Sequence, residues 1–147
     1  MRCKTFALIG AAMLSGCAAQ RIAPPQTPLH TQLFGSDKRD AVRTLVVVLH
    51  GDAGVATRAD PYAFAKAVTA AVPDSAALAI IRPGYGDVQG NRSPGIRGKG
   101  NGDNYTADRL KQIGDAIASA KAQLPRARVI LIGDNGGAAI AADIAGI

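Results

Sequence analysis

The chain is poor in cysteine and histidine, the two side chains that most often serve enzymes as thiol nucleophile and general base. Its 147 residues include two cysteines, Cys3 and Cys17, two histidines, His30 and His50, and no tryptophan. Beyond residue 17 the chain can form no disulfide and offers no thiol. Cysteine-based catalysis is therefore excluded, and histidine-dependent chemistry would have to use His30 or His50.

Nucleotide and nucleic-acid binding also lack support in the sequence. Neither G-x-x-x-x-G-K-[ST] nor a helix-opening G-x-G-x-x-G occurs, and we expect no cofactor. The formal net charge is +6, and several basic residues gather in the glycine-rich segment 90–100. That segment has no aromatic side chains on which bases could stack, so we interpret it as a solvated loop and expect no nucleic-acid partner.

The first 17 residues resemble the signal of a bacterial lipoprotein. Arg2 and Lys4 precede an apolar run over 6–14, and Leu14-Ser15-Gly16-Cys17 has the form of a small-residue cleavage site ending in cysteine. The run is too short for a transmembrane anchor, which needs about 20 apolar residues. The resemblance implies that residues 1–16 are a signal peptide, that Cys17 carries lipid, and that the protein is anchored on the periplasmic side of a bacterial envelope membrane.

The remainder divides into a tether and one domain. Residues 17–30 are proline-rich and are expected to be extended, and residues 31–147 are expected to fold. Apolar runs predict strands at 44–49, 77–81 and 128–132, with a weaker one at 31–34. Helical spacing predicts helices at 61–72, 106–124 and 138–144; the first would have Asp60 as its N-cap and an apolar stripe that includes Phe64 and Val72. This alternation predicts an α/β fold, a parallel sheet with helices on both faces.

The segment Gly133-Asp134-Asn135-Gly136-Gly137 joins the last predicted strand to the last predicted helix. Its glycines allow a sharp, strained turn that would raise the side chain of Asn135 above the sheet. The amides at the start of the helix could bind an oxyanion there. Strand, turn and helix therefore have the form of a nucleophile elbow, with asparagine at the position of the nucleophile.

Three segments, in this order, resemble the α/β-hydrolases: Val-Val-Leu-His-Gly at 47–51, Arg-Pro-Gly-Tyr-Gly at 82–86, and the strand and elbow at 130–137. The resemblance covers about residues 42–147 and implies a relationship to serine esterases and lipases. It also implies an oxyanion hole formed around His50, Gly51, Ala53 and Gly136.

The chain departs from that family at the catalytic residues. Asn135 replaces the usual serine, and the family's acid and histidine follow on later strands, whereas this sequence ends one helix after the elbow. We therefore expect a partial α/β-hydrolase fold, truncated after the elbow helix and catalytically incomplete alone. In the family the equivalent of His50 supports the oxyanion loop; a general-base role for His50 is the alternative.

Two aspartates are alternative nucleophiles. Asp134 lies one residue before the central elbow position, and Asp52 follows the His-Gly turn. We prefer structural roles for both, in a turn or at a helix N-terminus where the dipole favours a carboxylate. Asp87 is expected to be solvent-exposed.

Two further functions are compatible with the sequence. The chain could be a non-catalytic envelope module that retains an anionic or acyl ligand in its oxyanion pocket, or a fragment of an active hydrolase completed by a second chain. In either case the strand at 128–132 is expected to form an exposed apolar edge, where self-association or a partner chain could add to the sheet.

Overall fold

The computed structural model describes residues 28–52, 59–97 and 105–146. The predicted signal, Cys17 and Ala53 lie outside these ranges. The described residues form four strands, three α-helices and a short 3-10 helix at Arg39–Ala41. Among them, no helix is long and apolar enough to cross a membrane.

The strands form a mixed sheet rather than the wholly parallel one predicted. They are β1 (Thr31–Gly35), β2 (Thr44–Leu49), β3 (Ser75–Ile80) and β4 (Arg128–Gly133), in the spatial order β1-β3-β2-β4. β2 is parallel to β3 and β4, whereas β1 is antiparallel to β3. Only residues 36–43 separate β1 from β2. A parallel β1 would need a crossover of about a dozen residues or more, so the short connection imposes the antiparallel direction.

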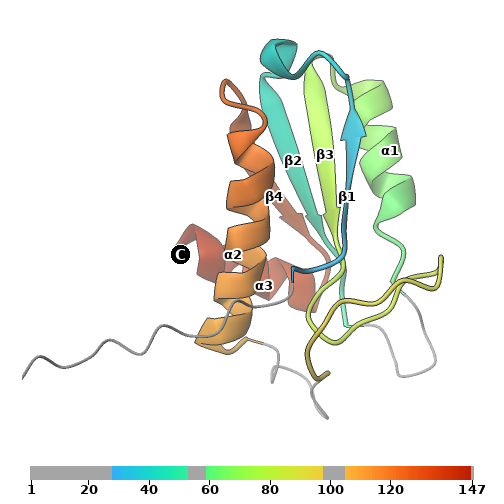
Figure 1. Cartoon of the computed structure of the whole chain (residues 1–147), viewed down its shortest axis with the longest axis vertical. Helices are drawn as coiled ribbons and strands as arrows, with labels where there is room; N and C mark the ends of the chain where they lie inside the picture. The colour runs from blue at the N-terminus through green and yellow to red at the C-terminus, as the bar shows by residue number, and fades with distance from the viewer. Residues whose placement is uncertain (1–27, 53–58, 98–104, 147) are drawn as a thin grey trace, which may run out of the picture.

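Helices cover both faces of this sheet, as predicted. α1 (Tyr62–Ala71) lies on one face, and α2 (Ala107–Ala122) and α3 (Gly136–Ala145) lie on the other (Figure 1). Alternate residues of β2 divide between these two cores. Val46 and Val48 pack with the α1 side, whereas Leu45, Val47 and Leu49 pack with Ile113 of α2 and Ile140 of α3, among others.

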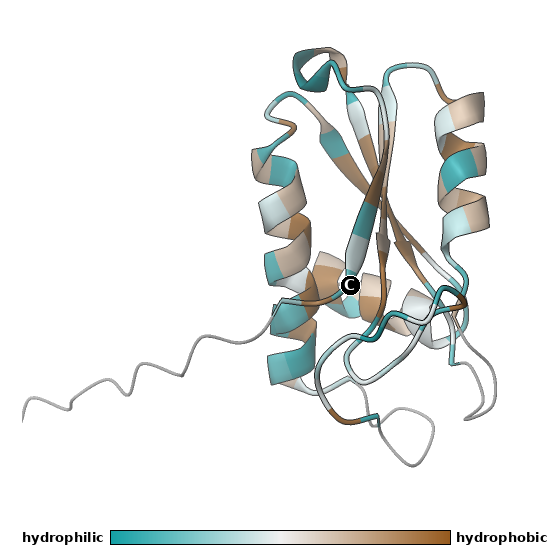
Figure 2. Ribbon diagram, turned by 45° about the vertical axis from the view of Figure 1, so that its right-hand side comes forward, coloured by the Kyte–Doolittle hydropathy of each residue, from teal (hydrophilic) through white to brown (hydrophobic). Residues whose placement is uncertain are grey.

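Burial differs sharply between the central strands and β4. Residues 45–49 of β2 and all of β3 are buried, which explains their uninterrupted apolar sequences. In β4, by contrast, Val129, Ile130 and Ile132 are 38%, 48% and 37% exposed. Figure 2 shows apolar residues along the central strands, with polar and apolar residues alternating on α1 and α2. The predicted exposed apolar edge at 128–132 is confirmed for Val129, Ile130 and Ile132.

Two details of α1 differ from the prediction. The N-cap is Pro61 rather than Asp60, although the Asp60 carboxylate accepts the N–H of Tyr62 at 3.2 Å. Phe64 and Val72, placed in the apolar stripe, are 48% and 40% exposed. α1 packs chiefly on β3 and β1. The stripe is therefore only partly covered, because no described helix lies beside α1 over β4.

Candidate functional site

The turn between β4 and α3 is strained at the residue that the elbow motif predicts. Asn135 has φ 46° and ψ −117°, values that lie outside the favoured regions for a residue with a side chain. Two glycines make the turn possible. A Cβ on Gly133 would lie 2.2 Å from the backbone of Gly137, and one on Gly137 would lie 2.2 Å from the carbonyl oxygen of Leu49. β4, α3 and the end of β2 are therefore in backbone contact here.

The side chains of the turn face solvent. Asn135 and Asp134 are both exposed. The backbone carbonyl of Asp134 accepts the N–H of Gly137 at 2.7 Å, and that of Asn135 accepts the N–H of Ala138 at 2.9 Å. The amide of Gly136 belongs to the first turn of α3, where helix geometry supplies no carbonyl partner. Asn135 thus stands at the mouth of a helix, in the position that a nucleophile occupies in an elbow.

His50 is buried with both ring nitrogens engaged. Its Nε2 accepts the backbone N–H of Arg82 at 3.0 Å, and Nδ1 lies 2.9 Å from the carbonyl oxygen of Gly51. This arrangement assigns the proton to Nδ1, which donates to Gly51. Burial lowers the pKa of His50 to about 4, and the nearby Arg82 guanidinium acts in the same direction. The ring therefore supports the loop as a neutral group, and its lone pair is not directed at Asn135.

Beside His50 lies a partly buried ion pair that the sequence did not indicate. The side chain of Arg82 is fully buried; its Nη2 donates to Oδ1 of Asp52 at 2.9 Å and its Nη1 donates to the carbonyl oxygen of His50 at 3.1 Å. The Arg82 guanidinium also lies 4.9 Å from the centre of the Tyr85 ring, and the Arg97 guanidinium lies 4.5 Å from it. This cluster ties the loop after β3 to the loop after β2.

Asp52 is held by more than its arginine. Its Oδ1 also accepts the Tyr85 hydroxyl at 3.2 Å, and its Oδ2 accepts the Tyr105 hydroxyl at 3.3 Å. Burial raises the pKa of this carboxyl, but the hydrogen bond and charge of Arg82 outweigh it, so the pKa lies below its usual range. A Cβ on Gly136 would lie 2.4 Å from Oδ2. An ionised carboxylate therefore already stands beside the N-terminus of α3, where the helix dipole favours it.

These contacts bear on the two roles considered for the aspartates. The oxygens of Asp52 are bound to Arg82 and two tyrosines, which favours a structural role. Asp134 is exposed, and its Oδ2 lies only 2.8 Å from where a Cβ on Gly51 would be. Its carboxylate therefore lies beside the Gly51 turn rather than at the central elbow position.

Several of the predicted site residues line a pocket of about 480 Å³ beside the elbow, which we call the elbow pocket. His50, Gly51, Asp52, Asp134 and Asn135 line it, together with the ends of β2 and β4, the start of α1 and the exposed Phe64. Among the sequence-predicted oxyanion residues, Gly136 does not line the pocket itself, and Ala53 lies outside the described residues.

Asp87 is fully buried, so the prediction that it is exposed was wrong. It accepts hydrogen bonds from the Tyr62 hydroxyl, the Asn91 side chain and the backbone amides of Gln89 and Asn91. Burial raises the pKa of Asp87, but the hydrogen bonds from these donors lower it by more. The pKa therefore lies below its usual range, and the carboxyl is ionised at neutral pH. Nε2 of His30 lies 3.5 Å from Oδ2 of Asp87.

The solvated-loop interpretation of 90–100 is wrong for part of that segment. Ser93 is buried and donates to the carbonyl oxygen of Ile81, and its hydroxyl accepts the N–H of His30. Gly84 donates its N–H to the carbonyl oxygen of Pro94 at 3.0 Å. A network of hydrogen bonds to serine, asparagine and backbone groups therefore anchors the described part of the loop, and such pairings leave no hydrophobic pattern in the sequence.

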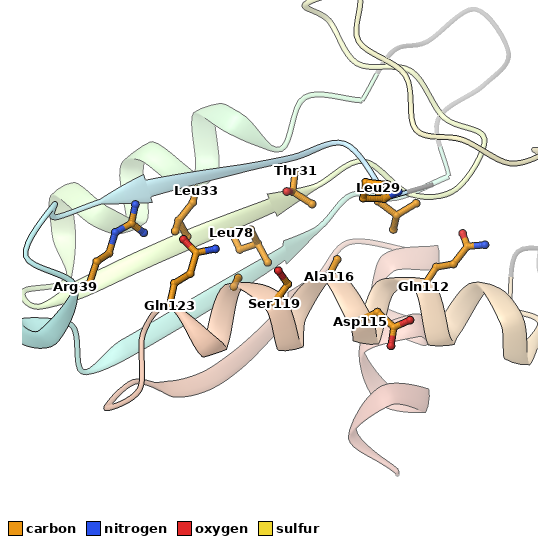
Figure 3. Close-up of a pocket in the computed structure, with 12 residues that line it drawn as sticks. Leu29, Thr31, Leu33, Arg39, Leu78, Gln112, Asp115, Ala116, Ser119 and Gln123 are labelled. Carbon is orange, nitrogen blue, oxygen red and sulfur yellow. The ribbon is translucent and has the colours of Figure 1, made fainter. Parts of the chain in front are cut away.

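A second pocket, of about 360 Å³, lies between the sheet and α2 (Figure 3). Leu33 and Leu78 form its floor from β1 and β3, and Ala116 and Ser119 face them from α2. It shares no lining residue with the elbow pocket. It contains none of the residues that the elbow motif singles out.

The described residues hold no group of three or more histidine, cysteine, aspartate or glutamate side chains placed to bind a metal ion. Comparison with known proteins gave no match to any family model, to any curated protein or to any solved structure.

Proposed function

We propose that this chain is an α/β-hydrolase-like protein, related to serine esterases and lipases, that binds a small uncharged acyl compound in its elbow pocket without hydrolysing it. The observation that carries the proposal is the backbone of Asn135. A strained, positive-φ residue between a parallel strand and a helix is what a nucleophile elbow requires, and here that residue is an amide.

The absence of turnover follows from the chemistry of the two central residues. An asparagine carboxamide has no proton that a base can usefully remove and is a poor nucleophile. His50, the one histidine at the pocket, already accepts the N–H of Arg82 on Nε2, the nitrogen that a general base would use. A base must first lie within hydrogen-bond reach of its target, and this ring is turned to another partner.

The charge of the pocket favours an uncharged ligand over an anion. Asp52, Asp60 and Asp134 all line it, and the Arg82 charge beneath is already paired with Asp52. A carboxylate ligand would meet these like charges at the helix N-terminus that Asp52 already occupies. A carbonyl group can instead accept from the Asn135 amide, while an alkyl chain lies against the exposed Phe64 and Ile132.

Ligand-detected NMR on residues 18–147 tests this proposal, with ethyl butyrate and butyrate as probes. We expect saturation transfer to ethyl butyrate and much less to butyrate. Phe64→Ala should reduce the transfer, whereas Val88→Ala should not, because Val88 is equally exposed but lies outside the pocket. Equal transfer in both variants, or release of ethanol that stops on His50→Gln, would contradict a binding role.

Envelope anchoring through Cys17 is a second part of the proposal and rests on the sequence alone. The small-residue site before Cys17 and the charged, apolar run that precedes it are typical of a lipoprotein signal. Growth in radiolabelled palmitate should label the parent chain, and Cys17→Ala should abolish the label. The matched Cys3→Ala variant should keep it, because Cys3 lies before the cleavage site. Labelling that persists in Cys17→Ala would exclude this anchor.

A further inference from the structure

The outer edge of β4 carries backbone groups that no described strand pairs. On its inner side β4 is in register with β2, from Thr44 opposite Arg128 to Leu49 opposite Gly133. β4 is the last strand in the order of the described sheet. An apolar strand edge of this kind is a template for adding another strand.

The hydrogen bonds to β2 identify which residues of β4 point outward. Arg128 donates its N–H to Arg43, and Asp134 donates its N–H to Leu49, so the even-numbered positions face β2. The N–H and C=O of one residue point to the same side of a strand, and successive residues alternate. Val129, Leu131 and Gly133 therefore present their backbone groups to the open edge.

The side chains at this edge form an apolar patch on the α1 face. Ile130 and Ile132 are in register with Val46 and Val48, whose side chains pack on the α1 side of the sheet. Residues in register on neighbouring strands share a face. Both isoleucines are more than a third exposed, and Ile132 lines the elbow pocket with the 48% exposed Phe64.

We propose that β4 pairs antiparallel with β4 of a second copy of this chain, with the two-fold axis passing between the two Leu131 residues. This register opposes Leu131 to Leu131 and Val129 to Gly133, so every outward-facing residue of β4 is paired. Antiparallel pairing of these residues gives about six inter-strand hydrogen bonds. The axis is perpendicular to the sheet, so Ile130 of each copy lies opposite Ile132 of the other on the α1 face.

Charge complementarity fixes this register and favours a second copy as the occupant. The same pairing places Arg128 of one copy opposite Asp134 of the other, and by symmetry Asp134 of the first opposite Arg128 of the second. Both side chains are exposed; Arg128 lies on the α1 side by its register with Thr44, and Asp134 lines the elbow pocket together with Phe64 of α1. A slip of two residues along the strand would lose two of the hydrogen bonds and set Arg128 against Ile132.

On the opposite face, α3 begins just beyond the C-terminal end of β4. That helix packs beside β4 on the α2 side. Its exposed residues at Ala138 and Ala139 are small. In this register the two helix starts lie at opposite ends of the paired strands, so they do not meet across the axis.

Charge reversal on the full chain in mild detergent tests the proposal by sedimentation velocity. The parent should be a dimer, and Arg128→Asp or Asp134→Arg alone should weaken dimerisation about tenfold or more by setting like charges opposite each other. The double variant should restore the parent's dimer. Lys111→Asp, a reversal on the exposed side of α2, should leave dimerisation unchanged. Circular dichroism on each variant separates loss of pairing from loss of fold.

Cysteine pairing tests the same register without changing a charge. Oxidation of a mixture of Ile130→Cys and Ile132→Cys, differently tagged, should join the two variants. Ile130→Cys alone should give no cross-link beyond that of the parent, because its own copies do not oppose each other. A monomeric parent, open-ended oligomers, a double charge variant that stays monomeric, or cross-linking of Ile130→Cys to itself would each overturn the proposal.

Discussion

Arg82 donates from Nη2 to Oδ1 of Asp52 at 2.9 Å; the side chain of Arg82 is fully buried, and that of Asp52 is 19% exposed. The two residues follow β3 and β2, so their pair fixes the relative positions of two loops at the carboxyl ends of neighbouring strands. The same carboxylate lies against Gly136 at the start of α3. The ion pair therefore links the loops after β2 and β3 to the start of α3.

Replacing Arg82 should destabilise the fold far more than breaking an exposed pair. Arg82→Met should lower the free energy of unfolding by about 3 kcal/mol, because it leaves the Asp52 carboxylate without its cation. Lys111→Met removes the partner of Asp115 from a pair that is 70% and 66% exposed, and should cost about 0.5 kcal/mol or less. Urea denaturation measures both. Equal losses in the free energy of unfolding would show that the Arg82–Asp52 pair stabilises the fold no more than the exposed Lys111–Asp115 pair does.

Stability should fall as the pH drops from about 6.5 to about 4, because of His50. Burial holds the pKa of His50 near 4 in the fold, whereas in the unfolded chain the group titrates near 6.5. Between these values the unfolded state binds the extra proton, so acid favours unfolding, by up to about 3 kcal/mol.

Chemical denaturation of the parent and of His50→Gln across this pH window measures the effect. The His50→Gln variant should show a much flatter dependence of its unfolding free energy on pH than the parent. The carboxyls of Asp52 and Asp87, with lowered pKa values, add their own losses only at more acid pH. A parent whose stability is constant between pH 6.5 and 4 would contradict the buried, neutral His50.

The elbow should not tolerate a methyl group where the strand and helix meet. Gly133→Ala places a Cβ 2.2 Å from the backbone of Gly137, and should prevent folding or lower the melting temperature steeply. Gly114→Ala is the matched control, because a Cβ at this half-buried position of α2 would meet nothing within 4 Å. That change should stabilise the protein by about 0.5–1 kcal/mol. Thermal melting followed by circular dichroism distinguishes the two.

The backbone of the site was predictable from the sequence, and most of its side-chain contacts were not. Glycines on both sides of a polar residue, between an apolar strand and a small-residue helix, are typical of a sharp turn. The strained turn at Gly133 and Asn135 could therefore be predicted. Asp52 and Arg82 are 30 residues apart, and neither lies in a pattern that predicts the other. The same limit applies to Asp87 and Tyr62, whose contact crosses from a loop to the start of α1.

The mixed sheet shows a different limit. The apolar sequence of β1 predicted a strand but carried no direction; the direction depends on the length of the connection to β2 and on β3, which comes later in the chain. Exposure of Phe64 likewise depends on what covers the sheet rather than on the residue itself, whereas the exposure of Ile130 was predicted from the position of its strand at the edge of the sheet.

Fluorophosphonate labelling of Asn135→Ser tests most directly the claim that this elbow binds without catalysing. A serine there would face the pocket but would have no base to remove its proton, since His50 is bound to Arg82 and Gly51. The account predicts that the folded variant is labelled no more than the parent or than a heat-denatured sample. Strong labelling that is lost on denaturation would contradict it, because it would show a working base at a site that one substitution had silenced.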